Sequence, residues 1–380
     1  MGLLAQIKNR GRQIKHLRGW KTDSKLVAFS VDDYGNVRTA DAAARDVLRQ
    51  KVPSFGGQMD EFDAVETRKD LEVLYEILSS HRDHNGNPCI FTAFCLSANA
   101  DFEKIRTGRE YAFETLAQTY ARLESRDPQA YSGMRQIWQE GMDADVIRPQ
   151  CHGREHICIP LIKRKLQQRA PDLEVNLQVD SMAGLTGLPE LNNVGFTQAF
   201  GLTETDRIPE QAQVIENGLG LFKEFFGFAS KTFVPPAAKF NRVHDELLLK
   251  LGVQGVDVPF LEYGNSFPLS RLPIVNFLGQ GKSNQPTRIV RTLSFEPCSG
   301  VKSDPIGYAL REVENAFACK RPVIISSHRV NFGGHIDAGN RDCGIKHLND
   351  LIAGICKRWP EVQFISVEGL VELMQQSAAH

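Results

Sequence analysis

Short apolar, β-branched segments alternate along this chain with longer segments of helical period. The short segments predict strands at residues 26–31, 89–96, 146–151, 232–234, 255–258, 289–295, 323–326 and 363–366. The longer ones predict helices at residues 70–79, 110–123, 160–168, 209–226, 243–251, 305–317, 348–358 and 367–375. Repeated strand–helix alternation is typical of a parallel sheet covered by helices. We therefore predict an α/β fold with a single (β/α) barrel, distorted and seven- or eight-stranded.

Two long irregular segments interrupt the alternation, at residues 172–206 and 262–287. Loops of this length usually carry function or lack order, so we expect both to be insertions that form walls of a substrate site. No proline- or serine-rich linker divides the chain. We expect one catalytic barrel domain over residues 25–380, preceded by a basic amphipathic segment at residues 1–24.

Six basic side chains precede the first acidic residue, Asp23, and six apolar side chains could share one side of a helix there. This pattern predicts a peripheral membrane contact through residues 1–21, or alternatively a solvated helix that covers the barrel floor. We find neither a signal peptide nor an apolar stretch of membrane-spanning length. We therefore expect a cytoplasmic location, with peripheral contact at the inner membrane face.

The composition narrows the function further. A net charge of −1 over 380 residues gives no basic surplus, so we expect no nucleic-acid partner. The eight cysteines form no CxxC pair, which argues against a zinc ribbon or a thioredoxin motif and favours reduced thiols. The sequence does not indicate an oligomeric state.

Two adjacent carboxylates, Asp32 and Asp33, follow the first predicted strand directly. Active sites of (β/α) barrels lie at the carboxyl ends of the strands, and adjacent side chains point in different directions. One carboxylate could therefore bind a metal while the other takes a proton. The alternative is a simple turn, since Asp-Asp-x-Gly also favours turns.

His152 and His156 follow the predicted strand at residues 146–151. On a helical turn, histidines at positions i and i+4 would reach one ion, and two histidines with one carboxylate leave coordination positions open for water. A third strand ends in Ser326-Ser327-His328, so His328 is expected at the same rim as a proton donor opposite the carboxylate base.

These motifs, in this order, resemble the polysaccharide deacetylase superfamily (carbohydrate esterase family 4) of glycoside hydrolase/deacetylase barrels. The segment 30–35 is similar to the family's Thr/Ser-Phe-Asp-Asp-Gly, with a valine for phenylalanine and an inserted tyrosine, and His152 and His156 match its His-x-x-x-His. The segment 233–238, followed by Leu251-Gly252, resembles Arg-Pro-Pro-Tyr-Gly with its later Leu-Gly step, and His328 matches the final Leu-x-His. The resemblance covers about residues 26–367.

The resemblance implies that Asp33, His152 and His156 bind a divalent metal, most plausibly Zn²⁺ with Co²⁺, Ni²⁺ and Fe²⁺ as alternatives. It also implies that Asp32 is the general base that activates a metal-bound water and that His328 is the general acid that protonates the leaving group. The expected activity is removal of an acetyl group from an N- or O-acetylated sugar or glycan precursor.

The chain departs from the family at two positions. Val234 stands where the family has arginine, and Ala237 where it has tyrosine. The family's arginine is thought to orient the base, so we expect Arg148 or Arg329 to replace it. These departures put polysaccharide specificity in doubt more than metal binding.

Polar residues near the predicted strand ends are candidates for substrate contact, because polar loops at a barrel rim suit sugar hydroxyls or anionic groups. The candidates are Arg148, Pro236, Glu296, Arg329, Asn331, His335 and Arg341, and Arg291 beside the 292–295 segment is of similar interest. A solvated loop is the alternative for each of them. Two other functions stay open: hydrolysis of a non-sugar C–N bond in an amide or ureide, and carbohydrate binding without catalysis.

Overall fold

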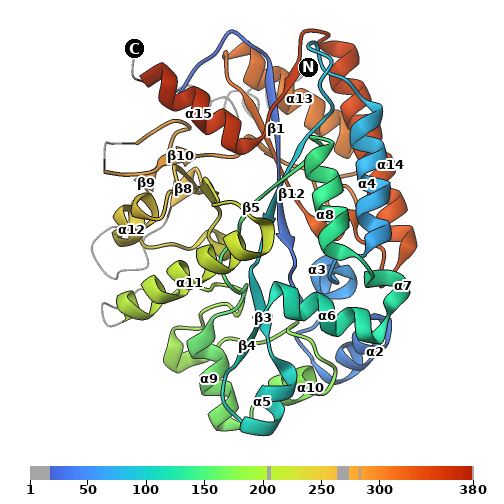
Figure 1. The fold of residues 1–380 in the computed structure, drawn as a ribbon, viewed down its shortest axis with the longest axis vertical. Coiled ribbons are helices and arrows are strands. Elements are labelled where there is room, and N and C mark those ends of the chain that lie inside the picture. Colours follow the sequence, from blue (N-terminus) through green and yellow to red (C-terminus); the bar gives the residue numbers. More distant parts are fainter. Residues whose placement is uncertain (1–17, 203–206, 263–273, 282–283, 379–380) are drawn as a thin grey trace, which may run out of the picture.

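A computed structural model describes residues 18–202, 207–262, 274–281 and 284–378. It shows a curled parallel sheet surrounded by helices, with β1 running through the middle of the molecule (Figure 1). The strands of this sheet follow the order β10-β7-β6-β5-β2-β1-β12-β11. Their bounds are Leu26–Tyr34 (β1), Phe91–Cys95 (β2), Ile147–Cys151 (β5), Thr232–Phe233 (β6), Gly255–Asp257 (β7), Thr287–Ile289 (β10), Leu293–Ser294 (β11) and Val323–His328 (β12).

The two ends of this order, β10 and β11, belong to one extended segment of the chain. Thr287–Ile289 pairs with β7, and Leu293–Ser294 pairs with β12, in both cases parallel. Only residues 290–292 separate the two strands. The sheet therefore closes into a ring through the chain itself, and the predicted distorted (β/α) barrel is confirmed, with seven members if the broken segment is counted once.

The other predicted strand, at residues 363–366, is the short β13 (Gln363–Phe364), which pairs with the start of β1. Every residue of β1 and β2 is buried. Strands covered on both faces need such continuous apolar sequences, which is why they stood out in the sequence. Two antiparallel strand pairs lie outside the ring: β3 (Ala98–Ala100) with β4 (Phe113–Thr115), and β8 (Leu261–Glu262) with β9 (Ile274–Val275).

Several of the helices that cover the sheet begin at residues whose side chains cap the first turn. Thr67 and Thr115 each form a capping box at the start of a helix, and Asp304 accepts a hydrogen bond from the first turn of another. The helices are Ala42–Lys51 (α2), Gly57–Phe62 (α3), Arg68–Ser80 (α4), Phe102–Gly108 (α5), Leu116–Arg126 (α6), Pro128–Tyr131 (α7), Met134–Asp143 (α8), Ile159–Gln168 (α9), Pro171–Gln178 (α10), Ile208–Phe226 (α11), Asp245–Lys250 (α12), Pro305–Ala318 (α13), Ala338–Arg358 (α14) and Val367–Ala378 (α15).

Four predicted elements are wrong in their bounds. The strand predicted at residues 289–295 is broken into β10, which ends at Ile289, and β11, which begins at Leu293. The helix expected from residue 110 begins at Leu116, because residues 113–115 pair with β3 instead. The segment 172–206, expected to be irregular, starts within helix α10. Helix α14 begins at Ala338, ten residues before the predicted start at 348.

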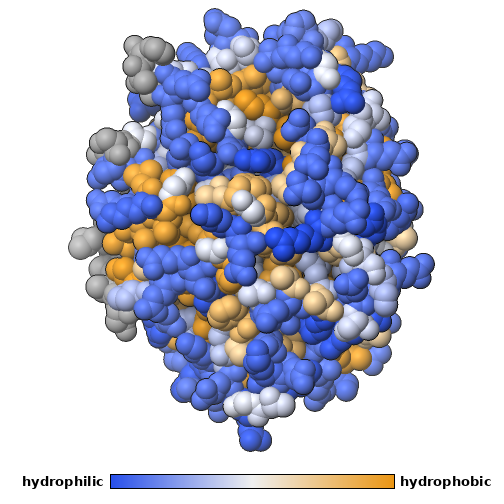
Figure 2. All heavy atoms as spheres, in the orientation of Figure 1, coloured by the Kyte–Doolittle hydropathy of each residue, from blue (hydrophilic) through white to orange (hydrophobic). Residues whose placement is uncertain are grey.

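Most of the predicted amphipathic segment lies outside the described residues, which begin at Arg18. In the described part of the chain, none of the helices combines the length and the apolar character that crossing a membrane would need. Apolar side chains gather on the side of the molecule that carries β8 and β9, where Leu261, Ile274 and Val275 are exposed (Figure 2).

Candidate functional site

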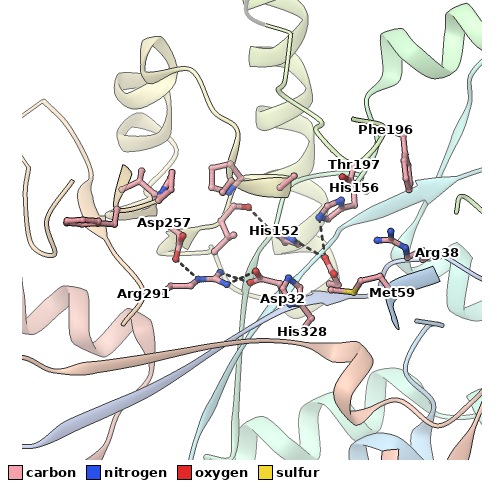
Figure 3. Close-up of a pocket in the computed structure, with 18 residues that line it drawn as sticks. Asp32, Arg38, Met59, His152, His156, Phe196, Thr197, Asp257, Arg291 and His328 are labelled. Atoms are coloured by element: carbon pink, nitrogen blue, oxygen red, sulfur yellow. Dashed lines mark hydrogen bonds and ion pairs between the residues drawn. The ribbon is translucent and has the colours of Figure 1, made fainter. Parts of the chain in front are cut away.

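A cavity of about 490 Å³ opens at the carboxyl ends of the strands. Seven of its polar side chains come from five segments of the ring (Figure 3): Asp32, Asp33, His152, His156, Asp257, Arg291 and His328. The structure thus brings together all five residues predicted to act in catalysis or metal binding. It adds Arg291 and Asp257, which the sequence did not assign to catalysis.

The end of β1 explains how two adjacent carboxylates line the same cavity. Neighbouring side chains of a regular strand point to opposite faces of the sheet. At Asp33 the backbone has φ 75°, a left-handed conformation, and the register with β2 shifts between Val31 and Tyr34. This irregularity lets Asp33 line the cavity together with Asp32. A non-glycine residue in this conformation is strained, and such strain clusters at functional sites.

Asp33, His152 and His156 form a compact set of potential metal ligands. The Oδ1 atom of Asp33 lies 3.3 Å from His152 Nε2 and 3.2 Å from His156 Nε2. The histidines follow β5 in a loop and not on the helical turn we expected, because Gly153 between them has φ +100°. The loop still directs both rings at the same carboxylate oxygen (Figure 3).

These three side chains fit a divalent cation. Nitrogen and oxygen ligands at about 2.0–2.2 Å from a tetrahedral ion lie about 3.3–3.5 Å apart, close to the distances found here. His152 Nδ1 lies 2.9 Å from the carbonyl oxygen of Val234, which fixes the ring and leaves its Nε2 lone pair for an ion. Burial lowers the pKa of His156 to about 4, so this imidazole is neutral at neutral pH. Although burial alone would raise the pKa of Asp33, the two histidines hold it well below its usual value, so the carboxylate is ionised.

Asp32 is held by Arg291 through two parallel hydrogen bonds. Arg291 Nη1 and Nη2 each donate to one carboxylate oxygen of Asp32 at 2.7 Å, and Arg291 Nε donates to Asp257 Oδ2 at 2.7 Å. Burial opposes ionisation of Asp32, but the guanidinium outweighs it and keeps the pKa of Asp32 below its usual value. Burial raises the pKa of Asp257 to about 6 even beside Arg291. Arg291 therefore orients and ionises the carboxylate predicted to be the base.

This arrangement corrects our expectation for the missing family arginine. Arg148 and Arg329 do not contact Asp32: Arg148 pairs with Glu368 of α15, and Arg329 is buried between Asp63 and Glu66. Arg291 reaches Asp32 because residues 290–292 join the two ends of the sheet order, where the ring closes. The contact spans 259 sequence positions, so sequence spacing alone did not reveal it.

His328 lies next to Asp32 in the sheet, since the two residues are partners in the β1–β12 register. Its Nδ1 lies 2.8 Å from Glu296 Oε1, which leaves Nε2 as the ring nitrogen that can donate into the cavity. Burial lowers the pKa of His328, but the hydrogen bond and charge of Glu296 outweigh it and raise this pKa to about 9. Glu296, predicted to contact substrate, instead supports the imidazole, and Asn331 donates a hydrogen bond to its other oxygen.

The remaining substrate candidates do not line the cavity either. Pro236 packs against Gly153, His335 lies edge-on to the ring of Tyr131, and Arg341 pairs with Asp70. Most of the other cavity walls come from residues that the sequence did not single out: Arg38, Met59, Phe196, Thr197, Pro235, Ala238, Val258, Pro259 and Phe260. Val234 and Ala237, the two departures from the family motif, also line the cavity. Asp257 had a usable signal, because it lies in the last two residues of the strand predicted at residues 255–258, and Asp32 also stands at the carboxyl end of a predicted strand.

Comparison of the sequence with protein-family models gives no match, and comparison with curated proteins gives none either. Comparison with solved structures gives matches of low identity. A probable polysaccharide deacetylase from Pseudomonas aeruginosa PAO1 is 10% identical with a TM-score of 0.48, covering 92% of this chain and 91% of that one.

Two further matches have other descriptions. A 4-alpha-glucanotransferase from Thermococcus litoralis is 7% identical with a TM-score of 0.47, covering 92% of this chain and 40% of that one. A CE4 family pseudoenzyme from Bacillus anthracis is 8% identical with a TM-score of 0.41, covering 92% and 66%. Folds shared across such different proteins do not identify an activity. The function is therefore inferred from the side chains of the cavity.

Proposed function

We propose that this protein is a metal-dependent hydrolase that removes an acetyl group from an N- or O-acetylated sugar or glycan precursor. One observation carries the proposal: a carboxylate held by Arg291 and an imidazole held by Glu296 line the same cavity as an Asp-His-His metal-ligand set. A protein that only bound carbohydrate would need neither a base nor an acid. The motifs that resemble carbohydrate esterase family 4 support the choice of an acetyl group.

The roles of the side chains follow from their contacts. Asp33, His152 and His156 would hold the cation, with Zn²⁺ best matched to a mixed imidazole and carboxylate set. Such a cation supplies positive charge that favours ionisation of water and stabilises a developing oxyanion. Asp32, fixed by Arg291, accepts the proton of the attacking water. His328, kept protonated by Glu296, donates its Nε2 proton to the leaving nitrogen or oxygen.

The walls suit a partly apolar substrate. Phe196 and Phe260 line the cavity together with Pro235 and Pro259. The guanidinium carbon of Arg38 lies 5.5 Å from the centre of the Phe196 ring. Aromatic and proline side chains offer apolar area to sugar rings, whereas a few polar groups orient the ligand. An acetylated sugar combines both characters.

The experiment measures acetate released from a panel of N- and O-acetylated sugars by the zinc-loaded protein. Asp32→Asn keeps the shape of the side chain but removes the base, so we expect acetate release to fall by at least about a hundredfold. Glu114→Gln, which changes a buried carboxylate paired with Arg122 outside the cavity, is the matched control and should keep the activity. Ammonia or urea released from amides or ureides would favour the alternative C–N hydrolase. Bound metal without product from any acyl, amide or ureide substrate would contradict a hydrolase altogether.

A further inference from the structure

A second group of metal-ligand side chains lies outside the cavity. Cys298 follows β11, whereas Cys343 and His347 lie on α14. One ligand atom from each of the three lies within 4.8 Å of the other two. We propose that Cys298, Cys343 and His347 form a second metal site that binds a thiophilic divalent cation such as Zn²⁺.

The helix places two of the ligands. Cys343 and His347 stand four residues apart, so their side chains lie on the same face of α14. Cys343 Sγ and His347 Nδ1 are 3.5 Å apart. Zinc ligated by sulfur at about 2.3 Å and by nitrogen at about 2.0–2.1 Å in tetrahedral geometry has these two atoms about 3.5 Å apart. The helix therefore holds the pair close to the spacing that zinc needs.

Cys298 brings the third ligand from a different part of the chain. Its Sγ donates a hydrogen bond to the carbonyl oxygen of Asn340 at 3.6 Å, which places it beside the first turn of α14. Its thiol also shares a hydrogen bond with Cys343. All three side chains are only partly buried, so an ion can reach them from solvent. Two thiolates and one imidazole are soft ligands, which select zinc over magnesium or calcium.

Binding rearranges protons but no covalent bonds between the residues. In the metal-free form His347 Nδ1 donates to the carbonyl oxygen of Cys343 at 2.8 Å. As the cation binds, this proton leaves Nδ1 and the imidazole is protonated at Nε2 instead. Both thiols release their protons to solvent, and the two thiolates balance the charge of the cation.

The site would tie the segment after β11 to α14. That segment also carries Glu296, the carboxylate that supports His328. A cation at Cys298 would therefore restrain the segment that positions the proposed acid. The metal site itself does not depend on the proposed hydrolase activity, because none of its three ligands lines the cavity.

Cobalt distinguishes the two sites, because only one of them contains sulfur. We load the full chain with Co²⁺ under a phosphine reductant, which keeps the thiols from forming a disulfide. We then measure bound cobalt and near-ultraviolet thiolate-to-cobalt charge-transfer absorption. We expect two cobalt ions per chain and a clear charge-transfer band. Cys298→Ser and Cys343→Ser should each lose the band and one cobalt ion, while the ion at Asp33, His152 and His156 remains.

Two further variants protect the interpretation. Cys356 also lies on α14, away from the proposed site, and its thiol donates a hydrogen bond to the carbonyl oxygen of Arg82. Cys356→Ser should therefore keep both cobalt ions and the charge-transfer band. His347→Asn leaves both thiols and should weaken the band and cobalt affinity at least about tenfold. Circular dichroism confirms that each variant is folded. One cobalt ion per wild-type chain without a charge-transfer band, or a band that survives in Cys343→Ser, would overturn the proposal.

Discussion

The hydrogen bond between Glu296 and His328 leads to a prediction about pH. Glu296→Gln keeps the length of the side chain and removes the charge that holds the proton on His328. We expect the pKa of His328 to fall from about 9 toward the ordinary histidine value of 6.5. If His328 is the general acid, activity is lost as this proton leaves. The alkaline limb of kcat/KM should therefore move down by about one to two pH units in the variant.

The same shift predicts how stability depends on pH. A rise in pKa from 6.5 to about 9 would correspond to at most about 3 kcal/mol of stability. Because 32% of the His328 side chain is exposed and solvent screens the pair, we expect about 1–2 kcal/mol. A raised histidine pKa stabilises the fold fully below pH 6.5, and this contribution disappears as the pH rises through about 9. The free-energy cost of Glu296→Gln should thus be largest near pH 6 and vanish above about pH 9.

The assay combines pH profiles of acetate release with urea unfolding from about pH 5 to about pH 10. Wild type and variant are compared with the same metal loading, because a bound cation repels the imidazolium and moves its pKa in both. Glu114→Gln is the control, since its carboxylate pairs with Arg122 away from the cavity. An alkaline limb that stays in place, or a loss of stability equal at every pH, would refute the role of Glu296.

Three other predictions test the ligand set and the buried arginines. Asp33→Ala should lower bound metal by one equivalent per chain, measured by atomic emission, while Asp60→Ala, outside the ligand set, should not. Arg291→Ala should reduce kcat about a hundredfold and shift the acid limb of the rate to higher pH, because Asp32 loses the charge that lowers its pKa; an unchanged limb would contradict this. Arg329→Ala should lower the free energy of unfolding in urea by about 3–5 kcal/mol, because Asp63 and Glu66 stay buried without their partner. Arg148→Ala, which removes only the ion pair with Glu368, should leave turnover near the wild-type value. An Arg329→Ala variant as stable as the wild type, or an Arg148→Ala variant with much reduced turnover, would argue against the assigned environments.

Most of the predicted strands are confirmed because the central ones, such as β1 and β2, are short apolar sequences buried on both faces. The catalytic and metal-ligand candidates were found for a related reason: Asp32, Asp33, His152 and His328 stand directly at strand ends, where a parallel sheet gathers its polar residues. Their roles stay predictions, but their meeting in one cavity follows from the parallel order of the strands.

What the sequence did not reveal depends on contacts between distant segments. Arg291 meets Asp32 only because the sheet curls until its two ends are neighbours. The first half of α14 was missed for a different reason, since Gly339 and Gly344 lower helix propensity. Gly344 is needed there: a Cβ would lie 1.6 Å from the carbonyl oxygen of Asn331. The glycine at position 344 is thus explained by close packing of α14 against the backbone of Asn331, which a local sequence pattern does not show.

The way the ring closes also determines how much strand edge is open to pairing with another molecule. An open sheet presents two edge strands whose unpaired amides and carbonyls can recruit strands of other molecules. Here residues 287–294 form one continuous segment that contains both β10 and β11, the two strands at the ends of the strand order. The edge of β10 that does not pair with β7 and the edge of β11 that does not pair with β12 therefore belong to the same short stretch of chain. Val290 and Thr292 are buried within it. The same stretch that carries Arg291 to Asp32 thus leaves little exposed edge for a strand of another molecule to extend.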